Sequence, residues 1–184
     1  MDIYGPAIQH DFMNGILQGK EVEKYVKKYK DAKHFYKNVD VHLSEECILY
    51  EVYSFKRGGN EVGNLNWGLT LLKPMNILGE CNMTRGHFHK DLNSAELYFG
   101  FAGKGLLLLM DDKGVCYSEK VFPGSIHHIN GRLAHRLINI GETDMKVGAC
   151  WPVQSGHDYE RIEKFPFRVR VFKDGEDIKI EEEE

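Results

Sequence analysis

The sequence predicts an all-β protein, built as a barrel or sandwich, with one short helical segment near the N-terminus. From Cys47 onward, short apolar segments are separated by glycine, proline, asparagine and aspartate. Many short strands with closely spaced turns and little helix are typical of such folds. The 184 residues include 19 glycines, ten phenylalanines and nine tyrosines, which also favour a turn-rich β architecture.

The expected strands follow one another closely through the middle of the chain. Arg57-Gly58-Gly59-Asn60 and Asp111-Asp112-Lys113-Gly114 read as the turns of two hairpins. The apolar run Leu106–Met110 is far too short to cross a membrane and is expected to be a buried strand. The strands are expected at Ile48–Phe55, Asn66–Leu72, Gly79–Met83, His87–His89, Glu96–Ala102, Leu106–Met110, Val115–Glu119, Ser125–His128, His135–Asn139 and Met145–Val153.

The two ends of the chain are expected to flank this barrel. Residues 19–36 are predicted to form the helix, because apolar residues recur there at helical spacing and lysines occupy the remaining positions. Residues 168–180 alternate weakly around Lys173-Asp174-Gly175 and predict a terminal hairpin. The like-charge run Glu181–Glu184 is expected to be a disordered tail.

Length and composition predict one soluble domain over residues 1–184. We divide it into an N-terminal extension (about 1–46), a barrel core (about 47–155), and C-terminal strands with the acidic tail (about 156–184). The net charge of −4 gives no reason to expect a nucleic-acid partner. No export signal or membrane-spanning run is visible, and the four cysteines form no Cys-x-x-Cys pair, so we expect a cytoplasmic protein with reduced thiols.

Three histidines and one glutamate form the most informative pattern in the sequence. His87 and His89 are two residues apart, so in a strand both side chains point to the same face. Glu96 follows a short turn, and His135 arrives from a later strand. Three imidazoles and a carboxylate are side chains that hold a divalent transition metal. We therefore predict a metal site at His87, His89, Glu96 and His135, inside the barrel.

Other histidines are expected to be structural. His127 and His128 are adjacent, and adjacent strand residues face opposite sides, so at most one can point into a barrel. His10, His34 and His42 stand alone and are expected to be ordinary surface or core residues.

These motifs resemble the cupins, a family of small jelly-roll-like β-barrels, in the Glu96…Gly103 spacing and the His135-x-x-x-Asn139 ending. Several further segments stand in the order found in the cupin-type glucose-6-phosphate isomerases of archaea and some bacteria. The resemblance runs from about Tyr50 to about Phe167, and Gly156-His157-Asp158-Tyr159 is its most discriminating part. The segments are Leu49–Tyr53, Thr84–His89, Ala95–Tyr98, Gly103–Gly105 and Ala134–Gly141.

The resemblance implies interconversion of glucose 6-phosphate and fructose 6-phosphate, a step of glycolysis and gluconeogenesis. It implies one divalent metal per chain, typically Fe2+, with Mn2+, Ni2+ or Zn2+ as substitutes. Glu96, His157 and Tyr159 are then expected to be catalytic or to contact the sugar. The residues expected to line the substrate or phosphate site are Tyr50, Thr70, Thr84, Arg85, Gly86, Tyr98 and Trp151.

Residue chemistry agrees with an aldose–ketose isomerase. A metal can bind two neighbouring oxygens while a carboxylate moves a proton between the carbons through a cis-enediol, so Glu96 could serve as ligand and base. A hydride shift stays open as the other route. The chain departs from the family pattern at Arg85, where lysine is common, and at Trp151, where tyrosine is common. Arginine keeps the charge with another shape, and tryptophan lacks the phenolic hydroxyl.

Two other functions share the same metal motif. An iron-dependent cupin dioxygenase would consume oxygen with its substrate, and a non-catalytic sugar-binding cupin would need no base. The Thr84-Arg85-Gly86 approach and the Gly156–Tyr159 segment favour the isomerase. Because exposed sheet edges promote pairing between chains, we also expect a homodimer with a small sugar phosphate as its ligand.

Overall fold

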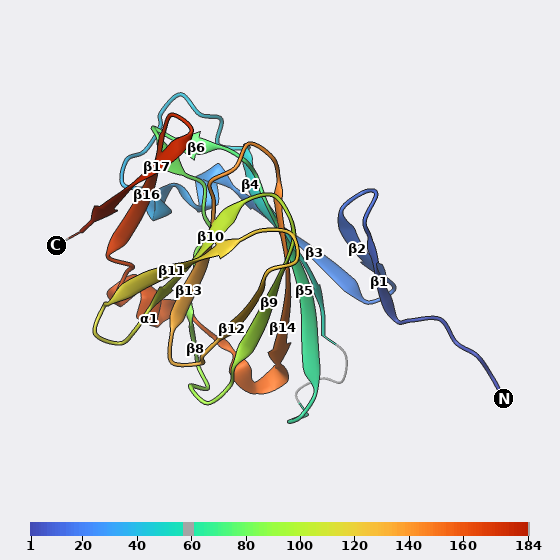
Figure 1. Ribbon diagram of the computed structural model, residues 1–184. Coiled ribbons are helices and arrows are strands. Elements are labelled where there is room, and N and C mark those ends of the chain that lie inside the picture. Colours follow the sequence, from blue (N-terminus) through green and yellow to red (C-terminus); the bar gives the residue numbers. More distant parts are fainter. Residues whose placement is uncertain (57–60, 184) are drawn as a thin grey trace.

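The larger wall of the barrel is an antiparallel sheet with the strand order β12-β9-β14-β5-β4-β3 (Figure 1). It appears in a computed structural model of the protein, which describes residues 1–56 and 61–183. In this sheet β4 pairs with β3 and β5, its neighbours in sequence, whereas β14 pairs with β5 and β9 from earlier parts of the chain. The strands of this wall are β3 (Val22–Lys28), β4 (Ile48–Phe55), β5 (Leu65–Leu72), β9 (Glu96–Ala102), β12 (Ile126–Ile129) and β14 (Met145–Pro152).

The facing wall combines a three-stranded sheet, in the order β11-β10-β13, with a two-stranded one that pairs β8 and β15. Isolated bridges from Met83 to Ile138 and from His87 to His135 attach the segment before β8 to β13. The strands are β10 (Gly105–Met110), β11 (Cys116–Val121), β13 (Ala134–Asn139), β8 (Phe88–His89) and β15 (His157–Asp158).

Smaller elements close the ends of the barrel. A four-stranded sheet has the order β17-β16-β7-β6, and the hairpin β1-β2 stands beside the main sheet near the N-terminus (Figure 1). These elements are β1 (Ile8–Asp11), β2 (Ile16–Gly19), β6 (Asn76–Ile77), β7 (Glu80–Cys81), β16 (Val169–Asp174), β17 (Asp177–Glu182), the helix α1 (Tyr159–Lys164) and the 3-10 helices η1 (Tyr29–Asp31), η2 (Lys33–Phe35) and η3 (Val153–Ser155).

The hydrophobic core fills one end of the space between the two walls. Every residue of β10 is buried, which confirms the prediction of a buried strand at Leu106–Met110. Asn139 of the predicted motif is also buried, and its amide donates to the carbonyls of Leu72 (2.8 Å) and Thr143 (3.0 Å). This asparagine therefore fixes the end of β13 to the opposite sheet, because a buried amide is stable only when it is hydrogen-bonded.

The all-β cupin barrel is confirmed, and the predicted strands match the observed ones within a few residues. Ile48–Phe55 and Glu96–Ala102 have the expected bounds, and 168–180 forms the terminal hairpin β16-β17. The predicted turn at 57–60 lies outside the described residues. None of the helices in the described ranges has the length and apolar character needed to cross a bilayer.

The predicted N-terminal helix over residues 19–36 is wrong. Val22–Lys28 is the strand β3, which pairs antiparallel with β4 at the edge of the main sheet, and only the two short 3-10 helices follow. Tyr25, placed on the supposed apolar face, is 52% exposed. The segment contains valines and a tyrosine, which suit a strand, and the free edge of β4 offers the hydrogen bonds that override a helical pattern.

The prediction of a disordered acidic tail is also wrong for residues 181–183, which are ordered. Glu181 and Glu182 belong to β17, and Glu181 pairs with Lys37 (2.9 Å) and Lys179 (2.8 Å). Glu183 forms an ion pair with Arg170. Cations from distant parts of the chain thus offset the repulsion among the like charges, while Glu184 lies outside the described residues.

Candidate metal centre and active site

Three strands bring His87, His89, Glu96 and His135 together inside the barrel. His89 ends β8, Glu96 begins β9, His135 lies in β13, and the bridge between His87 and His135 holds the first strand to the third. One possible ligand atom from each residue lies within 4.8 Å of the other three. The four side chains, whose spacing in the sequence predicted that they would converge, therefore form one compact cluster.

Hydrogen bonds orient these side chains toward a common centre. Nδ1 of His89 donates to the carbonyl of Ser94 at 2.7 Å, and Nε2 lies 3.1 Å from Oε2 of Glu96. In the neutral ring, Nε2 is therefore the atom that carries the lone pair. Nε2 of His135 lies 3.2 Å from the same oxygen, in an orientation that makes no hydrogen bond. Outer hydrogen bonds of this kind fix the tautomer and direction of a ligand imidazole.

The cluster also fits a metal because two of its ring nitrogens have no hydrogen-bond partner in the described structure. Nε2 of His87 and Nε2 of His135 are buried without a hydrogen-bond partner among the described residues. Buried polar atoms without partners cost free energy, and a divalent cation would satisfy both nitrogens at once. Three imidazoles with one carboxylate suit iron, manganese, nickel or zinc.

For Glu96 and His87, the environment favours the protonation states that metal ligands require. Burial alone would raise the pKa of Glu96, but the interactions of this carboxylate with the nearby imidazoles of His135 and His89 outweigh it and lower that pKa to about 2. Burial, reinforced by the neighbouring histidines, holds the pKa of His87 well below its ordinary value. Glu96 is therefore ionised and His87 neutral at pH 7, which leaves their donor atoms free to bind a cation.

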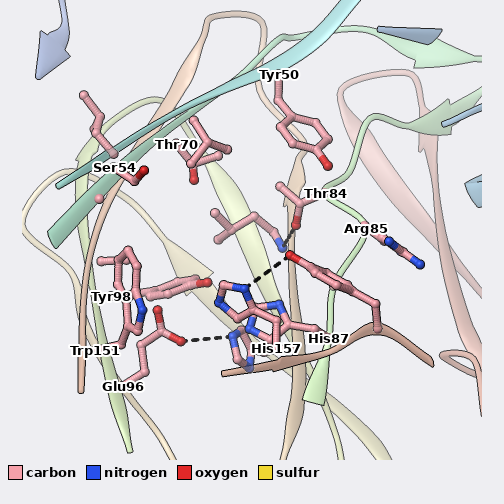
Figure 2. Close-up of a pocket in the computed structure, with 18 of the residues that line it drawn as sticks. Tyr50, Ser54, Thr70, Thr84, Arg85, His87, Glu96, Tyr98, Trp151 and His157 are labelled. Carbon is pink, nitrogen blue, oxygen red and sulfur yellow. Dashed lines mark hydrogen bonds and ion pairs between the residues drawn. The ribbon is translucent and has the colours of Figure 1, made fainter. Parts of the chain in front are cut away.

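The metal cluster lies at the bottom of a cavity of about 230 Å³ between the two walls (Figure 2). Side chains on the inward faces of β4, β5, β9, β13 and β14 form its sides, and α1 with the segment before it closes one end. Every residue expected at the substrate site or in catalysis lines this cavity, namely Tyr50, Thr70, Thr84, Arg85, Gly86, Glu96, Tyr98, Trp151, His157 and Tyr159.

The Thr84-Arg85-Gly86 loop is held against β13 by backbone geometry. The amide of Thr84 donates to the carbonyl of Leu137 (2.9 Å), and the amide of Leu137 donates to Oγ1 of Thr84 (3.0 Å). Gly86 has a φ of +75°, and a Cβ there would lie 2.7 Å from the ring of Phe167 and 3.0 Å from the carbonyl of His135. Only glycine fits this close turn, which sets the loop directly before ligand His87.

Arg85 and the residues after β15 form the end wall of the cavity. The Arg85 guanidinium stacks 4.3 Å over the ring of Tyr159 and pairs with Glu163 of α1. The Tyr159 hydroxyl lies 3.4 Å from Nδ1 of His157, whose ring centre is 4.2 Å from that of His87. Aromatic, imidazole and guanidinium groups thus lie next to the metal cluster at one end of the cavity.

Two polar cavity residues were missed in the sequence. Ser54 and Lys56 line the same cavity as Tyr50 and Val52. Tyr50, Val52 and Ser54 alternate along β4, and Lys56 continues the alternation directly after the strand, so the period of two that placed His87 and His89 would have identified both missed residues. The histidine His127 lies elsewhere: its ring nitrogens contact Glu119 (2.6 Å) and Ser125 (2.9 Å), as expected of a structural residue.

Comparisons with known proteins point to one family. A family model described as "Glucose-6-phosphate isomerase (GPI)" matches residues 26–182. The chain is 31% identical over 173 residues to "Glucose-6-phosphate isomerase" of Thermococcus kodakarensis, covering 92% of this chain and 90% of that protein. It is 30% identical to the protein of the same name from Pyrococcus furiosus, with 95% and 93% covered.

Solved structures show weaker likeness. An oxalate oxidase in complex with the substrate analogue glycolate superposes with a TM-score of 0.47 at 14% identity, covering 81% of this chain and 60% of that one.

Proposed function

This chain belongs to the glucose-6-phosphate isomerase family, and we propose that it interconverts glucose 6-phosphate and fructose 6-phosphate at one divalent metal per chain. The observation that carries the proposal is that one cavity brings hydroxyls, the guanidinium of Arg85 and the further imidazole of His157 next to a cluster whose four ligand atoms lie within 4.8 Å of one another. We propose Fe2+ as the metal, with Mn2+, Ni2+ or Zn2+ as substitutes that the same donor set accepts.

We assign the phosphate group of the sugar to the end of the cavity that Tyr50, Thr84 and Arg85 line. Hydroxyl groups and a guanidinium bind phosphate oxygens by charge-assisted hydrogen bonds without a glycine-rich nucleotide loop. Thr70 and Gly86 border the same space. A sugar anchored there extends its reacting carbons toward Glu96, while Tyr98, Trp151, His157 and Tyr159 surround its hydroxyls.

Glu96 is the group we propose for proton transfer. A bound metal supplies Lewis-acid stabilisation of the oxygens on the two reacting carbons. Glu96 would take the proton from one carbon and return it to the next, through a cis-enediol of the substrate. His157 and Tyr159 would orient the sugar, because their polar atoms lie 3.4 Å apart beside the metal cluster.

The direct test is an assay of glucose 6-phosphate formed from fructose 6-phosphate under argon, with metal-free and metal-loaded protein. We expect turnover that depends on metal and needs no oxygen. Oxygen consumption coupled to turnover of another substrate would identify a dioxygenase instead, and sugar-phosphate binding without turnover would identify a binding protein. Each metal is added separately, so the same assay ranks Fe2+, Mn2+, Ni2+ and Zn2+.

We also propose that the protein is a homodimer. The edge strand β3 and the hairpin β1-β2 present exposed apolar residues, including Phe12 (74%) and Met13 (95%). Exposed edges and apolar side chains favour association of chains. Light scattering at micromolar concentration should give twice the 21.2 kDa of one chain, and a mass near 21.2 kDa would contradict the dimer.

A further inference from the structure

A second cavity, of about 160 Å³, lies behind β13, on the side of that strand away from the metal. His135 and Leu137 face the metal cavity, whereas Arg136, between them, faces the second one. Segments from both ends of the chain close it, because η2, α1 and β16 each contribute residues. Its basic lining residues are His34, Arg85, Arg136 and Arg170.

Arg136 forms contacts with neutral groups, and its charge interacts with buried Glu80 only from a distance, without a direct ion pair. One guanidinium nitrogen donates to the carbonyl of Arg85 (2.6 Å), another lies 2.9 Å from the sulfur of Met83, and the group stacks 4.3 Å over the ring of Phe167. In the part of the chain that the structure describes, its Nε is buried without a hydrogen-bond partner. No carboxylate within residues 1–56 and 61–183 forms an ion pair with it.

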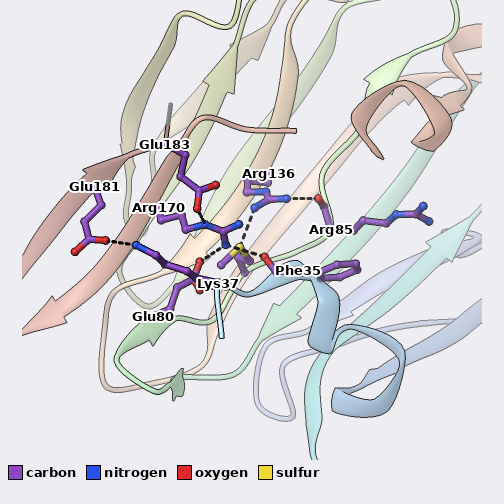
Figure 3. A network of polar contacts seen from close by, with 9 residues as sticks. Phe35, Lys37, Glu80, Arg85, Arg136, Arg170, Glu181 and Glu183 are labelled. Carbon is purple, nitrogen blue, oxygen red and sulfur yellow. Dashed lines mark hydrogen bonds and ion pairs between the residues drawn. The ribbon is translucent and has the colours of Figure 1, made fainter. Parts of the chain in front are cut away.

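The neighbouring arginines differ from Arg136 in this respect. Arg170 is held by Glu80 (2.8 Å) and Glu183 (Figure 3). Arg85 pairs with Glu163. The side chain of Glu163 is 57% exposed, so it can turn into solvent at little cost. A guanidinium removed from water without an anion is unfavourable, because nothing replaces the hydration it loses.

We propose that this second cavity binds a small phosphate-bearing anion, with Arg136 as its main contact. The planar donors of arginine match phosphate oxygens, and the buried Nε of Arg136 is a donor left over for that purpose. Arg85 and His34 border the same space and add further donors. Both inorganic phosphate and the phosphate group of a small ester have this chemistry.

Arg85 connects the proposed anion site with the substrate cavity. It lines both cavities, and Arg136 holds its backbone carbonyl. Two dianions next to one guanidinium repel each other, so binding at one cavity weakens binding at the other, and linkage makes the effect reciprocal. Phosphate behind β13 is therefore expected to raise KM for fructose 6-phosphate even where it does not enter the substrate cavity.

Calorimetry on the metal-loaded protein tests the site. The substrate cavity is first saturated with glucitol 6-phosphate, which has no carbonyl to isomerise, and inorganic phosphate or glycerol 3-phosphate is then titrated at constant ionic strength. We expect one further anion per chain, and comparing the two titrants distinguishes free phosphate from an ester. If saturation of the wild-type protein with glucitol 6-phosphate abolished all binding of phosphate, the proposal would be overturned.

Matched variants identify the contact. Arg136→Gln should weaken phosphate binding at least tenfold, Arg136→Lys less, and Arg132→Gln, which removes an exposed charge from the loop before β13, not at all. Equal affinity in the first and last variants would refute the assignment. Should Arg136→Gln fail to fold, the wild-type stoichiometry and Arg136→Lys still decide. A protein without isomerase activity would still show the Arg136 effect, so the two proposals fail separately.

Discussion

The two faces of β13 carry two polar sites that are built in different ways. On one face, His135 meets His87, His89 and Glu96, all on strands whose pairing the barrel itself fixes. On the other face, Arg136 meets η2, α1 and β16, which come from the two ends of the chain. Among the described residues, each face has buried nitrogen atoms without hydrogen-bond partners. The difference indicates that the candidate metal centre is a property of the barrel, whereas the arginine cavity depends on how the terminal segments pack.

The largest loss of activity should come from His135→Ala, which changes only the face of β13 that carries the candidate metal ligands. Removing one of four ligands should lower metal affinity and activity together by more than about 100-fold, since even outer-shell changes cost about 10–100-fold. Metal content by elemental analysis and turnover of fructose 6-phosphate measure this. If phosphate binding behind β13 were lost as well, the two faces would not be independent. Full metal content with full activity would remove His135 from the site.

Glu96→Gln separates the two roles proposed for this carboxylate. Glutamine keeps the size and a weak oxygen donor but cannot carry the proton, so we expect turnover to fall about 10²–10⁴-fold with much of the metal retained. Deuterium entering C2 from solvent during wild-type turnover would support the enediol. Near-normal turnover in the metal-loaded variant would leave Glu96 as a ligand only and favour a hydride shift.

Arg85→Ala should affect both faces, because Arg85 borders both cavities. Loss of a charged hydrogen bond to phosphate, about 1.5–3 kcal/mol, corresponds to a rise in KM of about 10–100-fold. Initial-rate kinetics with fructose 6-phosphate and with free fructose test this. Free fructose should be a poor substrate for wild type and variant alike, and equal efficiency on both sugars would contradict a phosphate subsite.

The smallest effect is expected for Glu181→Gln, which changes the terminal segments alone. Glu181 is bound by Lys179 and Lys37, and hydrogen bonds from these two lysines lower its pKa from 4.5 to about 2. A lowered carboxylate pKa stabilises the fold above pH 4.5, and this stabilisation is lost as the pH falls toward 2. Melting curves at pH 7 should differ by no more than about 2 °C. A difference that grew on acidification would have the wrong sign.

Local geometry explains how much could be predicted from the sequence. The period of two fixed the relation of His87 to His89, and turn residues separated the strands, so the barrel and the metal cluster followed from short segments. Val22–Lys28 could not be assigned in this way, because its pairing partners in β4 lie at least twenty residues away. The order of the acidic tail likewise depends on Lys37, which is distant in sequence.

The second cavity, lined by Arg85, Arg136 and Arg170, was even harder to predict from local sequence. Arg136 stood within a recognised motif, yet nothing near it in sequence indicates that its side chain faces Phe35, Phe167 and Arg170. Three separate segments must dock before that environment exists. Non-local packing of this kind leaves no periodic pattern in the sequence. The histidines on the opposite face of β13 could be predicted because His87 and His89 are spaced two residues apart.

The pairing of β15 with β8 has a consequence for the order of folding. His157 lies opposite His89, so the strand that presents two histidines is braced by a segment near the end of the sequence. Contacts between such distant residues form slowly, because a long loop must first close. During synthesis from the N-terminus, this pairing can form only after residue 158 has emerged, so the support that β15 gives to β8 is completed late in the folding of each new chain.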